Sequence, residues 1–309
     1  MKHINNILVA SELNKESYEA LAYGITLGLM YDAKVSCIHV VKPSPLDIIK
    51  ETFHIGSAKY GEALIHAKEE SQNLLGHIID VIAKELGVGE VNVDLKIVNG
   101  ALSKCIMDHA EKIKADVVII GTEPGSRFSR TAHTNLAINM IASEKANVLL
   151  IPSEFKMERI EQLGAFVNFE VEEVDFIHKM INHAKKTENG IKLIHVIEHG
   201  ESVEKAKVMQ ESFERLFAKE IRQDGVKFEL ELGALHQVVN DLKAKHGIDL
   251  MVIRAYKRHW DMYTSSTSFS DKVIRNIKSP LMIWKNTRKV KRIIVEDKLK
   301  GTLNKFSKN

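Results

Sequence analysis

The sequence ADVVIIG at residues 115–121 recurs as IDLMVIR at residues 248–254. Each copy follows a Gly-Ala-Leu tripeptide, at residues 100–102 and 233–235, so the repeat holds over 133 positions without a gap. The apolar run is short and rich in branched residues, which is typical of a strand buried on both faces of a parallel sheet. Because ~100–200 residues make a domain, this spacing predicts two tandem copies of one domain.

Apolar runs alternate with helical patterns through both copies. Strands are predicted at residues 6–10, 34–41, 91–98, 117–120 and 148–151, and again at 163–168, 191–197, 226–232, 250–253 and 281–284. Helices are predicted at residues 20–29, 102–113, 136–142, 174–184, 203–221 and 270–277, with one more ending at residue 245. The alternation predicts an α/β fold of two five-stranded parallel sheets, each covered on both faces in the Rossmann-like manner.

The copies differ in length between their second and third strands. CIHVV at residues 37–41 matches LIHVI at residues 193–197, but these are 156 positions apart, so the first copy carries about 23 extra residues within 42–89. Residues 43–61 of this insertion hold an apolar piece between prolines and glycines. A lid, a partner surface and a longer crossover all fit, and the crossover is the preferred interpretation.

Composition places the chain among ordinary globular proteins, with 309 residues, 44% hydrophobic and 28% charged. The predicted organisation is domain 1 at residues 1–152, a linker at 153–162, domain 2 at 163–285 and a basic tail at 286–309. Lys285 and the tail carry nine Lys or Arg against two acidic residues, so the net charge of +3 becomes about −4 without them. Nucleic-acid association through the tail is one hypothesis, and a solvated terminus is the preferred one.

Two further features bear on location. No apolar run reaches the ~18 residues of a membrane span, and the N-terminus lacks a signal-peptide core. The two cysteines, Cys37 and Cys105, lie in apolar periodic segments, which indicates reduced thiols and not a disulfide framework. We therefore expect a cytoplasmic protein without a membrane partner.

A ligand of an open parallel sheet binds beyond the carboxyl ends of the strands, near the point where the strand order reverses. The loop there in the first copy is GTEPGSRFSRTAHTN, residues 121–135, and a helix follows it. Glycines, hydroxyls and arginines before a helix N-terminus suit a phosphate, because free N–H groups and the helix dipole favour an anion.

With this loop, the chain resembles the universal stress protein (Usp) family, duplicated in tandem. The resemblance covers nearly all of residues 4–285 and rests on NILVA at 6–10, IHVV at 38–41, the 115–121 strand and the closing ANVLLIP at 146–152. It implies the adenine nucleotide alpha-hydrolase-like fold, a role in stress survival and dimerisation through the last strand. In one branch it also implies ATP binding through a loop written G-x-x-G-x9-G-S/T.

The candidate nucleotide site of the first copy departs from that loop. Pro124 stands at the second glycine, which removes one N–H donor, and Thr134 replaces the third glycine. Glu12 matches the acidic residue that follows the first strand in ATP-binding members. The residues that the resemblance implies for cofactor binding are Glu12, Val41, Gly121, Gly125, Ser126, Arg127, Arg130 and Asn135.

The second copy departs further. Arg254 and Lys257 stand at the first two glycine positions, and Asn168 stands at the acidic position. We expect Arg254 to fill the space that a triphosphate would occupy. Any ATP site therefore belongs to the first copy.

Metal and catalytic sites are not expected. His195 and His199 lie ~13 Å apart if both are on one strand, which is too far to chelate one zinc ion. The equivalent histidines His39 and His195 are most simply explained by duplication, and no nucleophile with a nearby base is evident.

Two functions follow from these residues. The first is a non-enzymatic stress-response protein, a regulatory or protein-binding module with weak or lost nucleotide binding and an unidentified protein partner. The alternative is an ATP-binding sensor, with or without slow hydrolysis, that uses the first copy only. Pairing of strands 148–151 and 281–284 would give a pseudo-dimer within one chain, because pairing removes an exposed apolar edge, and homodimerisation remains an alternative.

Overall fold

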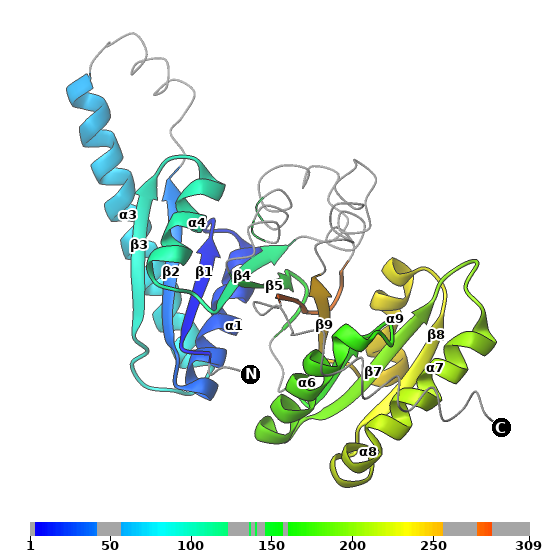
Figure 1. The fold of residues 1–309 in the computed structure, drawn as a ribbon. Coiled ribbons are helices and arrows are strands. Elements are labelled where there is room, and N and C mark those ends of the chain that lie inside the picture. Colours follow the sequence, from blue (N-terminus) through cyan, green and yellow to red (C-terminus); the bar gives the residue numbers. More distant parts are fainter. Residues whose placement is uncertain are drawn as a thin grey trace, which may run out of the picture. The chain divides into compact units, whose positions relative to one another are not determined.

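The computed structural model describes residues 4–41, 57–122, 146–156, 160–255 and 277–285, together with Leu136 and Met140. The chain divides into two compact units. Strands β1 to β5 belong to the first unit and strands β6 to β10 to the second (Figure 1).

The first unit is built on five strands in the order β3-β2-β1-β4-β5. All neighbouring pairs in it are parallel. The strands are β1 (Asn6–Ser11), β2 (Lys34–Val41), β3 (Val93–Asn99), β4 (Val117–Thr122) and β5 (Asn147–Pro152). Every residue of β4 is buried, as a near-continuous apolar run predicts for a strand covered on both faces.

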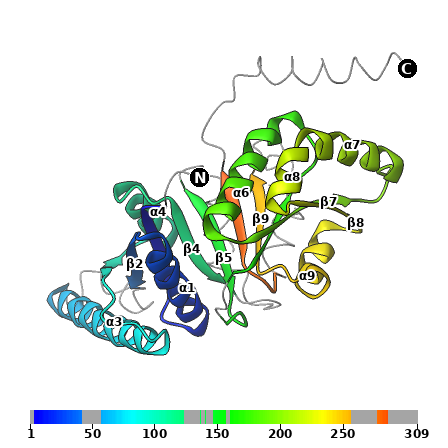
Figure 2. The same ribbon diagram turned by 90° about the horizontal axis from the view of Figure 1, so that it is seen from below.

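Helices cover both faces of this sheet. Helices α1 (Lys15–Tyr31) and α3 (Ser57–Glu85) lie on one face, and α4 (Leu102–Lys112) lies on the other (Figure 2). Gly24 allows α1 to approach β1, since a Cβ built on it would lie 2.5 Å from a methyl carbon of Val9. The chain runs outward from β1 through β2 to β3, and then returns to β4 on the other side of β1. Strands β1 and β4 are therefore neighbours at the centre of the sheet, where the strand order reverses.

The second unit repeats this order as β8-β7-β6-β9-β10, again with parallel neighbours. Its strands are β6 (Gln162–Phe166), β7 (Gly190–Ile197), β8 (Lys227–Leu232), β9 (Leu250–Ala255) and β10 (Leu281–Lys285). The 3-10 turn η1 (Val171–Glu173) precedes helix α6 (Val174–Thr187), which shares one face with α7 (Val203–Leu216) and α8 (Ala218–Asp224). Helix α9 (Leu235–His246) covers the other face. The α/β fold and the ten predicted strands are thus confirmed.

Equivalent backbone features show that the two units are copies. Asp116 Oδ2 accepts the N–H groups of residues 5 and 6 at 2.9 and 3.1 Å, and Asp249 Oδ2 accepts those of residues 161 and 162 at 2.9 and 3.0 Å. Leu13 and Phe169, which are 156 positions apart, both adopt positive φ, at 58° and 56°. These aspartates join the start of one strand to the start of its neighbour, which explains their recurrence.

One helix was not predicted, and one predicted helix is divided. Helix α3, of 29 residues, lies between the second and third strands, where no helix was predicted. Of the predicted apolar segment at 43–61, residues 43–56 lie outside the described residues. The helix predicted at residues 203–221 is two helices, α7 and α8, that meet at Phe217. The helices predicted at 136–142 and 270–277 lie almost wholly outside the described residues.

The core of the second unit is aromatic where that of the first is mainly aliphatic. Phe213 lies 5.3 Å from Phe169 and 6.3 Å from Phe217, and Phe217 lies 6.3 Å from Phe228, measured between ring centroids. These four rings fill the layer between the sheet and helices α7 and α8. Offset aromatic contacts at these distances add to the gain from apolar burial.

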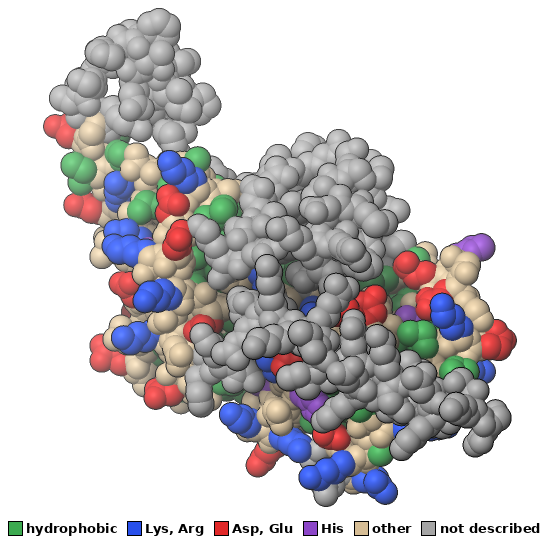
Figure 3. All heavy atoms as spheres, in the orientation of Figure 1, with side chains coloured by type: hydrophobic (Ala, Val, Ile, Leu, Met, Phe, Trp, Pro, Cys, Tyr) green, Lys and Arg blue, Asp and Glu red, His purple; other side chains and the backbone are tan. Residues whose placement is uncertain are grey.

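The charged side chains on the surface of α3 are of both signs. Acidic and basic side chains alternate over α3 in the face that Figure 3 shows, so this helix presents no field of a single sign. Both cysteines are free, as expected, and burial raises the pKa of the Cys37 thiol to about 12. Among the described residues, none of the helices combines the length and the hydropathy that a bilayer crossing requires.

Candidate functional site

The candidate site of the first unit lies at the carboxyl ends of β1, β2 and β4. Glu12 directly follows β1, Val41 ends β2, and Gly121 is the next-to-last residue of β4. Because these strands are neighbours in the sheet, the three residues share the edge at which ligands of parallel sheets bind. Glu12 and Val41 are half-buried and Gly121 is buried.

Gly121 is required by packing, whatever it binds. A Cβ built on it would lie 2.3 Å from the carbonyl oxygen of Glu16 and 2.5 Å from its carbonyl carbon. Contacts of this kind leave no room for any side chain unless α1 moves away from β4. The glycine that the resemblance assigns to a phosphate cradle therefore already has a structural reason to be glycine.

The start of α1 is capped by its own side chains. The Asn14 side chain accepts the N–H of Ser17 at 3.0 Å, and the Ser17 hydroxyl accepts the N–H of Asn14 at 3.0 Å, which is a reciprocal capping box. Ser11 Oγ also accepts the N–H of Leu13 at 3.3 Å. Several donors that an anion would use at this helix start are thus already occupied.

One buried hydroxyl lies beside Gly121. Thr122 is only 5% exposed, and its Oγ1 has no hydrogen-bond partner among the residues that the structure describes. A buried polar group without a partner costs about 1–3 kcal/mol. Thr122 was not among the predicted site residues, and its place beside Gly121 is the only signal in the sequence that could have identified it.

Five of the eight candidate residues cannot be placed relative to Glu12, Val41 and Gly121. They lie outside the described part of the chain: Gly125, Ser126, Arg127, Arg130 and Asn135.

In the second unit, Arg254 stands where Gly121 stands in the first. Its guanidinium Nη1 donates a hydrogen bond to the carbonyl oxygen of Glu172, the residue equivalent to Glu16. The same strand end and the same helix start are therefore joined in both units, by direct backbone packing in one and by a side chain in the other. As expected, Arg254 takes up space at the switch point, and it does so as part of the fold.

Glu173 closes this end of the second sheet. It is 1% exposed, and one carboxylate oxygen accepts the N–H groups of Asn168 and Glu170 at 2.7 and 3.2 Å. Burial raises the pKa of Glu173 to about 7, against the opposing effects of these two N–H groups and of Arg254. Glu173 replaces Ser17 of the first unit, so a carboxyl group and a guanidinium stand where the first unit has its candidate nucleotide site.

The recurring histidines tie strands together. His39 Nδ1 lies 2.8 Å from the carbonyl oxygen of Ser11, and His195 Nδ1 lies 2.9 Å from that of Val167. Each ring thus holds the end of its second strand against the end of the first. Among the described residues, no three His, Cys, Asp or Glu side chains gather as metal ligands.

One serine–histidine pair was not predicted. Ser36 Oγ lies 3.2 Å from His109 Nε2, but the Ser36 hydroxyl donates to the Asp94 carbonyl oxygen at 3.1 Å. The histidine then donates to the serine oxygen, the reverse of the arrangement in which a general base activates a nucleophile. Burial lowers the pKa of His109, which favours this neutral donor. The pair joins α4 to β2.

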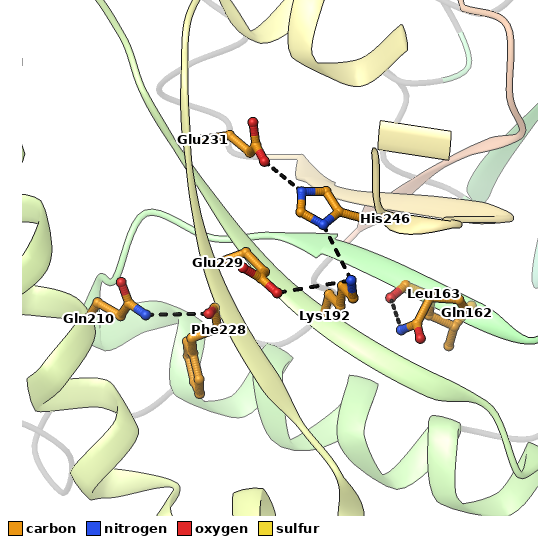
Figure 4. Close-up of polar contacts among 8 residues, drawn as sticks. All are labelled: Gln162, Leu163, Lys192, Gln210, Phe228, Glu229, Glu231 and His246. Atoms are coloured by element: carbon orange, nitrogen blue, oxygen red, sulfur yellow. Dashed lines mark hydrogen bonds and ion pairs between the residues drawn. The ribbon is translucent and has the colours of Figure 1, made fainter. Parts of the chain in front are cut away.

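An ionic cluster stands on the α9 face of β7 and β8 (Figure 4). Lys192 Nζ lies 3.3 Å from His246 Nδ1, and His246 Nε2 contacts a carboxylate oxygen of Glu231, while Lys245 reaches the other at 2.8 Å. Burial alone would raise the pKa of Glu231, but the hydrogen bonds from Lys245 and His246 lower it. The cluster fastens the end of α9 to the edge strand.

Comparison with known proteins agrees with this geometry. Residues 3–152 match the family model described as Universal stress protein family. A universal stress protein of Methanocaldococcus jannaschii is 28% identical over 145 residues, covering 47% of this chain and 80% of that protein.

Two crystal structures share the fold of the whole chain. A universal stress protein from Archaeoglobus fulgidus matches with a TM-score of 0.64 and 16% identity, over 91% of this chain and 98% of that one. The structure of a putative universal stress protein from Pseudomonas aeruginosa matches with a TM-score of 0.58 and 14% identity, over 91% of this chain and 93% of that one. These similarities extend the fold assignment to the second unit.

Proposed function

Because the chain belongs to the universal stress protein family through residues 3–152, we propose that it acts as a non-enzymatic, regulatory stress-response protein that binds another protein. In this proposal the second unit binds no nucleotide and the first binds it weakly or not at all. The protein works in the cytoplasm as a pseudo-dimer formed by its own two units.

One observation carries the part of this proposal that concerns the second unit. The guanidinium of Arg254 is bonded to the start of the helix, and the carboxyl group of Glu173 is buried next to the same helix start. A triphosphate there would have to displace the arginine and approach a carboxylate. Displacing the arginine opposes binding because it breaks a charge-assisted hydrogen bond, and Glu173 adds repulsion between like charges as it ionises above its pKa of about 7.

The first unit supports the alternative, an ATP-binding sensor. Thr122 offers a buried hydroxyl with no partner beside Gly121, and Glu12 follows β1 at half-burial. Against it stand the self-capped start of α1 and the proline at position 124. The two functions differ in whether the first unit holds nucleotide at cellular concentration.

Titration calorimetry of the full chain with Mg-ATP separates them. We expect no saturable heat below about 1 mM ATP, which is within the range of cellular nucleotide concentrations. Saturable binding at micromolar ATP would overturn the proposal. Gly121→Arg is unsuitable as a control because it would disrupt packing against α1, so Arg127→Ala and Thr122→Val are the variants to compare if binding is found.

A further inference from the structure

A pocket of about 540 Å³ opens in the second unit, at the carboxyl ends of β7 and β8. Its walls include Ile197 at the end of β7, Glu198 after it, Glu201 and Val203 before and in α7, and Leu232 at the end of β8. The volume is large enough for a small molecule, but the pocket is open to solvent, since residues 198–201 at its rim are exposed. It lies toward the edge strand, whereas the closed switch point lies between β6 and β9.

The backbone holds the rim of this pocket in a fixed shape. Gly233 N–H donates to the carbonyl oxygen of Ile197 at 3.2 Å, which ties the two strand ends together. The N–H of Glu201 donates to the carbonyl oxygen of Glu198 at 3.0 Å and closes a turn. Gly200 and Gly233 adopt φ of 95° and 137°, conformations that favour glycine.

One wall of the pocket is apolar, and its side chains are not buried in the core. Leu232 is 68% exposed, and Val203 lines the same pocket. The equivalent residue of the first unit, 133 positions earlier, is Asn99. An apolar ligand chain that packed against this exposed side chain would remove apolar surface from water, which favours binding.

The other wall carries two glutamates, Glu198 and Glu201, with His199 between them in the sequence. Glu198 Oε1 accepts the N–H of Leu235 at 3.1 Å, so its negative charge stands at the start of α9 and offsets the positive end of the helix dipole. Glu201 Oε1 lies 2.9 Å from His195 Nε2, which fixes the second carboxylate at the rim. A ligand that matches both walls carries a positive charge next to an apolar chain.

We propose that this pocket binds a small organic cation, an ammonium or guanidinium group on a short apolar chain. The cationic group pairs with the Glu198 carboxylate, and the chain packs against Leu232 and Val203. The site does not depend on nucleotide binding in the first unit or on the proposed protein partner.

Calorimetry of the full chain with pentylamine, pentylguanidine and pentanoate tests the charge requirement. These probes share the apolar chain and differ in the head group. We expect both cations to bind at least tenfold more tightly than pentanoate. Comparing the affinities of the two cations shows whether the pocket prefers an ammonium or a guanidinium group. Equal affinity for the cations and for pentanoate would overturn the proposal.

Three variants locate the binding. Glu198→Gln removes the charge but keeps an amide oxygen for the N–H of Leu235, and we expect pentylamine affinity to fall about fivefold, in line with the modest strength of exposed ion pairs. Leu232→Asn copies the first unit, leaves the core intact because the side chain is 68% exposed, and is expected to weaken binding similarly. Glu211→Gln, on the exposed face of α7, is the matched control.

The outcomes are distinct. Loss of affinity in both pocket variants with an unchanged Glu211→Gln control supports the site. Unchanged affinity in Leu232→Asn, or an equal loss in Glu211→Gln, would show nonspecific attraction to an acidic surface and refute it. Urea unfolding followed by tryptophan fluorescence confirms that Glu198→Gln is folded, because both tryptophans belong to the second half of the sequence.

Discussion

The buried carboxyl group of Glu173 should make the stability of the second unit depend on pH. Its pKa is raised by burial to about 7, from an ordinary value of 4.5 that the unfolded chain retains. Between these two values the folded protein holds a proton on Glu173 that the unfolded chain has released. The contribution of this group to stability is therefore fully present below about pH 4.5 and is lost as the pH rises through 7.

The size of the effect follows from the same shift. One pKa unit corresponds to about 1.4 kcal/mol, so the change from 4.5 to about 7 amounts to ~3 kcal/mol. Because the unfolded carboxyl is already mostly ionised at pH 5, about 2.5 kcal/mol of this falls between pH 5 and pH 8. Glu173 is 1% exposed, so solvent screening reduces the value little.

Glu173→Gln isolates this contribution. The amide has nearly the same shape, its oxygen can accept the N–H groups of Asn168 and Glu170, and it does not titrate. We expect the free energy of unfolding of the wild type, relative to Glu173→Gln, to fall by about 2.5 kcal/mol from pH 5 to pH 8. Glu172→Gln, an exposed neighbour, should show no such change.

Urea unfolding monitored by tryptophan fluorescence measures the second unit separately, since Trp260 and Trp284 are the only two tryptophans and Trp284 is 8% exposed in β10. A difference between wild type and Glu173→Gln that stays constant within about 0.5 kcal/mol from pH 5 to 8 would refute the reasoning. It would mean that Glu173 is ionised in the fold throughout, held by Arg254 and the two N–H groups.

Three other predictions concern the scaffold. Gly121→Ala should destabilise the first unit by about 1–3 kcal/mol, because the methyl group meets the backbone of Glu16; calorimetric unfolding should show the lower transition while the tryptophan signal stays unchanged. Asp249→Ala should cost about 2 kcal/mol in tryptophan-monitored unfolding, since two N–H groups lose a charged acceptor. Phe213→Ala, at 4% exposure within the aromatic cluster, should cost about 3–5 kcal/mol by the same measurement, and a loss below 1 kcal/mol would show that the cluster collapses around it.

Most strands were predictable because they are short apolar runs bounded by polar turns, and because the repeat allowed each one to be checked twice. Helix α3 was harder to predict. None of the residues from 61 to 70 is buried, so the first part of the helix has no core face to give a periodic signal. The break between α7 and α8 at Phe217 has no proline or glycine to mark it.

The position of the candidate site was predictable from the sequence, but the contacts of its residues were not. Strand order alone places Glu12, Val41 and Gly121 at one edge of the sheet. The sequence could not show that Gly121 is required by α1, because that contact joins residues 105 positions apart. Nor could it show that the hydroxyl of Thr122 lacks a partner, since hydrogen-bond satisfaction depends on the packing of every neighbouring element.

The two units differ in what lies opposite one equivalent backbone carbonyl oxygen, that of Glu16 in the first unit and Glu172 in the second. In the first unit the Glu16 carbonyl lies so close to β4 that only glycine fits opposite it; in the second, the Glu172 carbonyl accepts the guanidinium of Arg254. The 3-10 turn η1 provides that carbonyl, and its last residue, Glu173, is buried. Replacing Arg254 alone would leave that carboxyl group in place. In the proposal, the absence of nucleotide binding in the second unit therefore rests on Arg254, Glu173 and the helix start between them, whereas the pocket between β7 and β8 lies apart from all three.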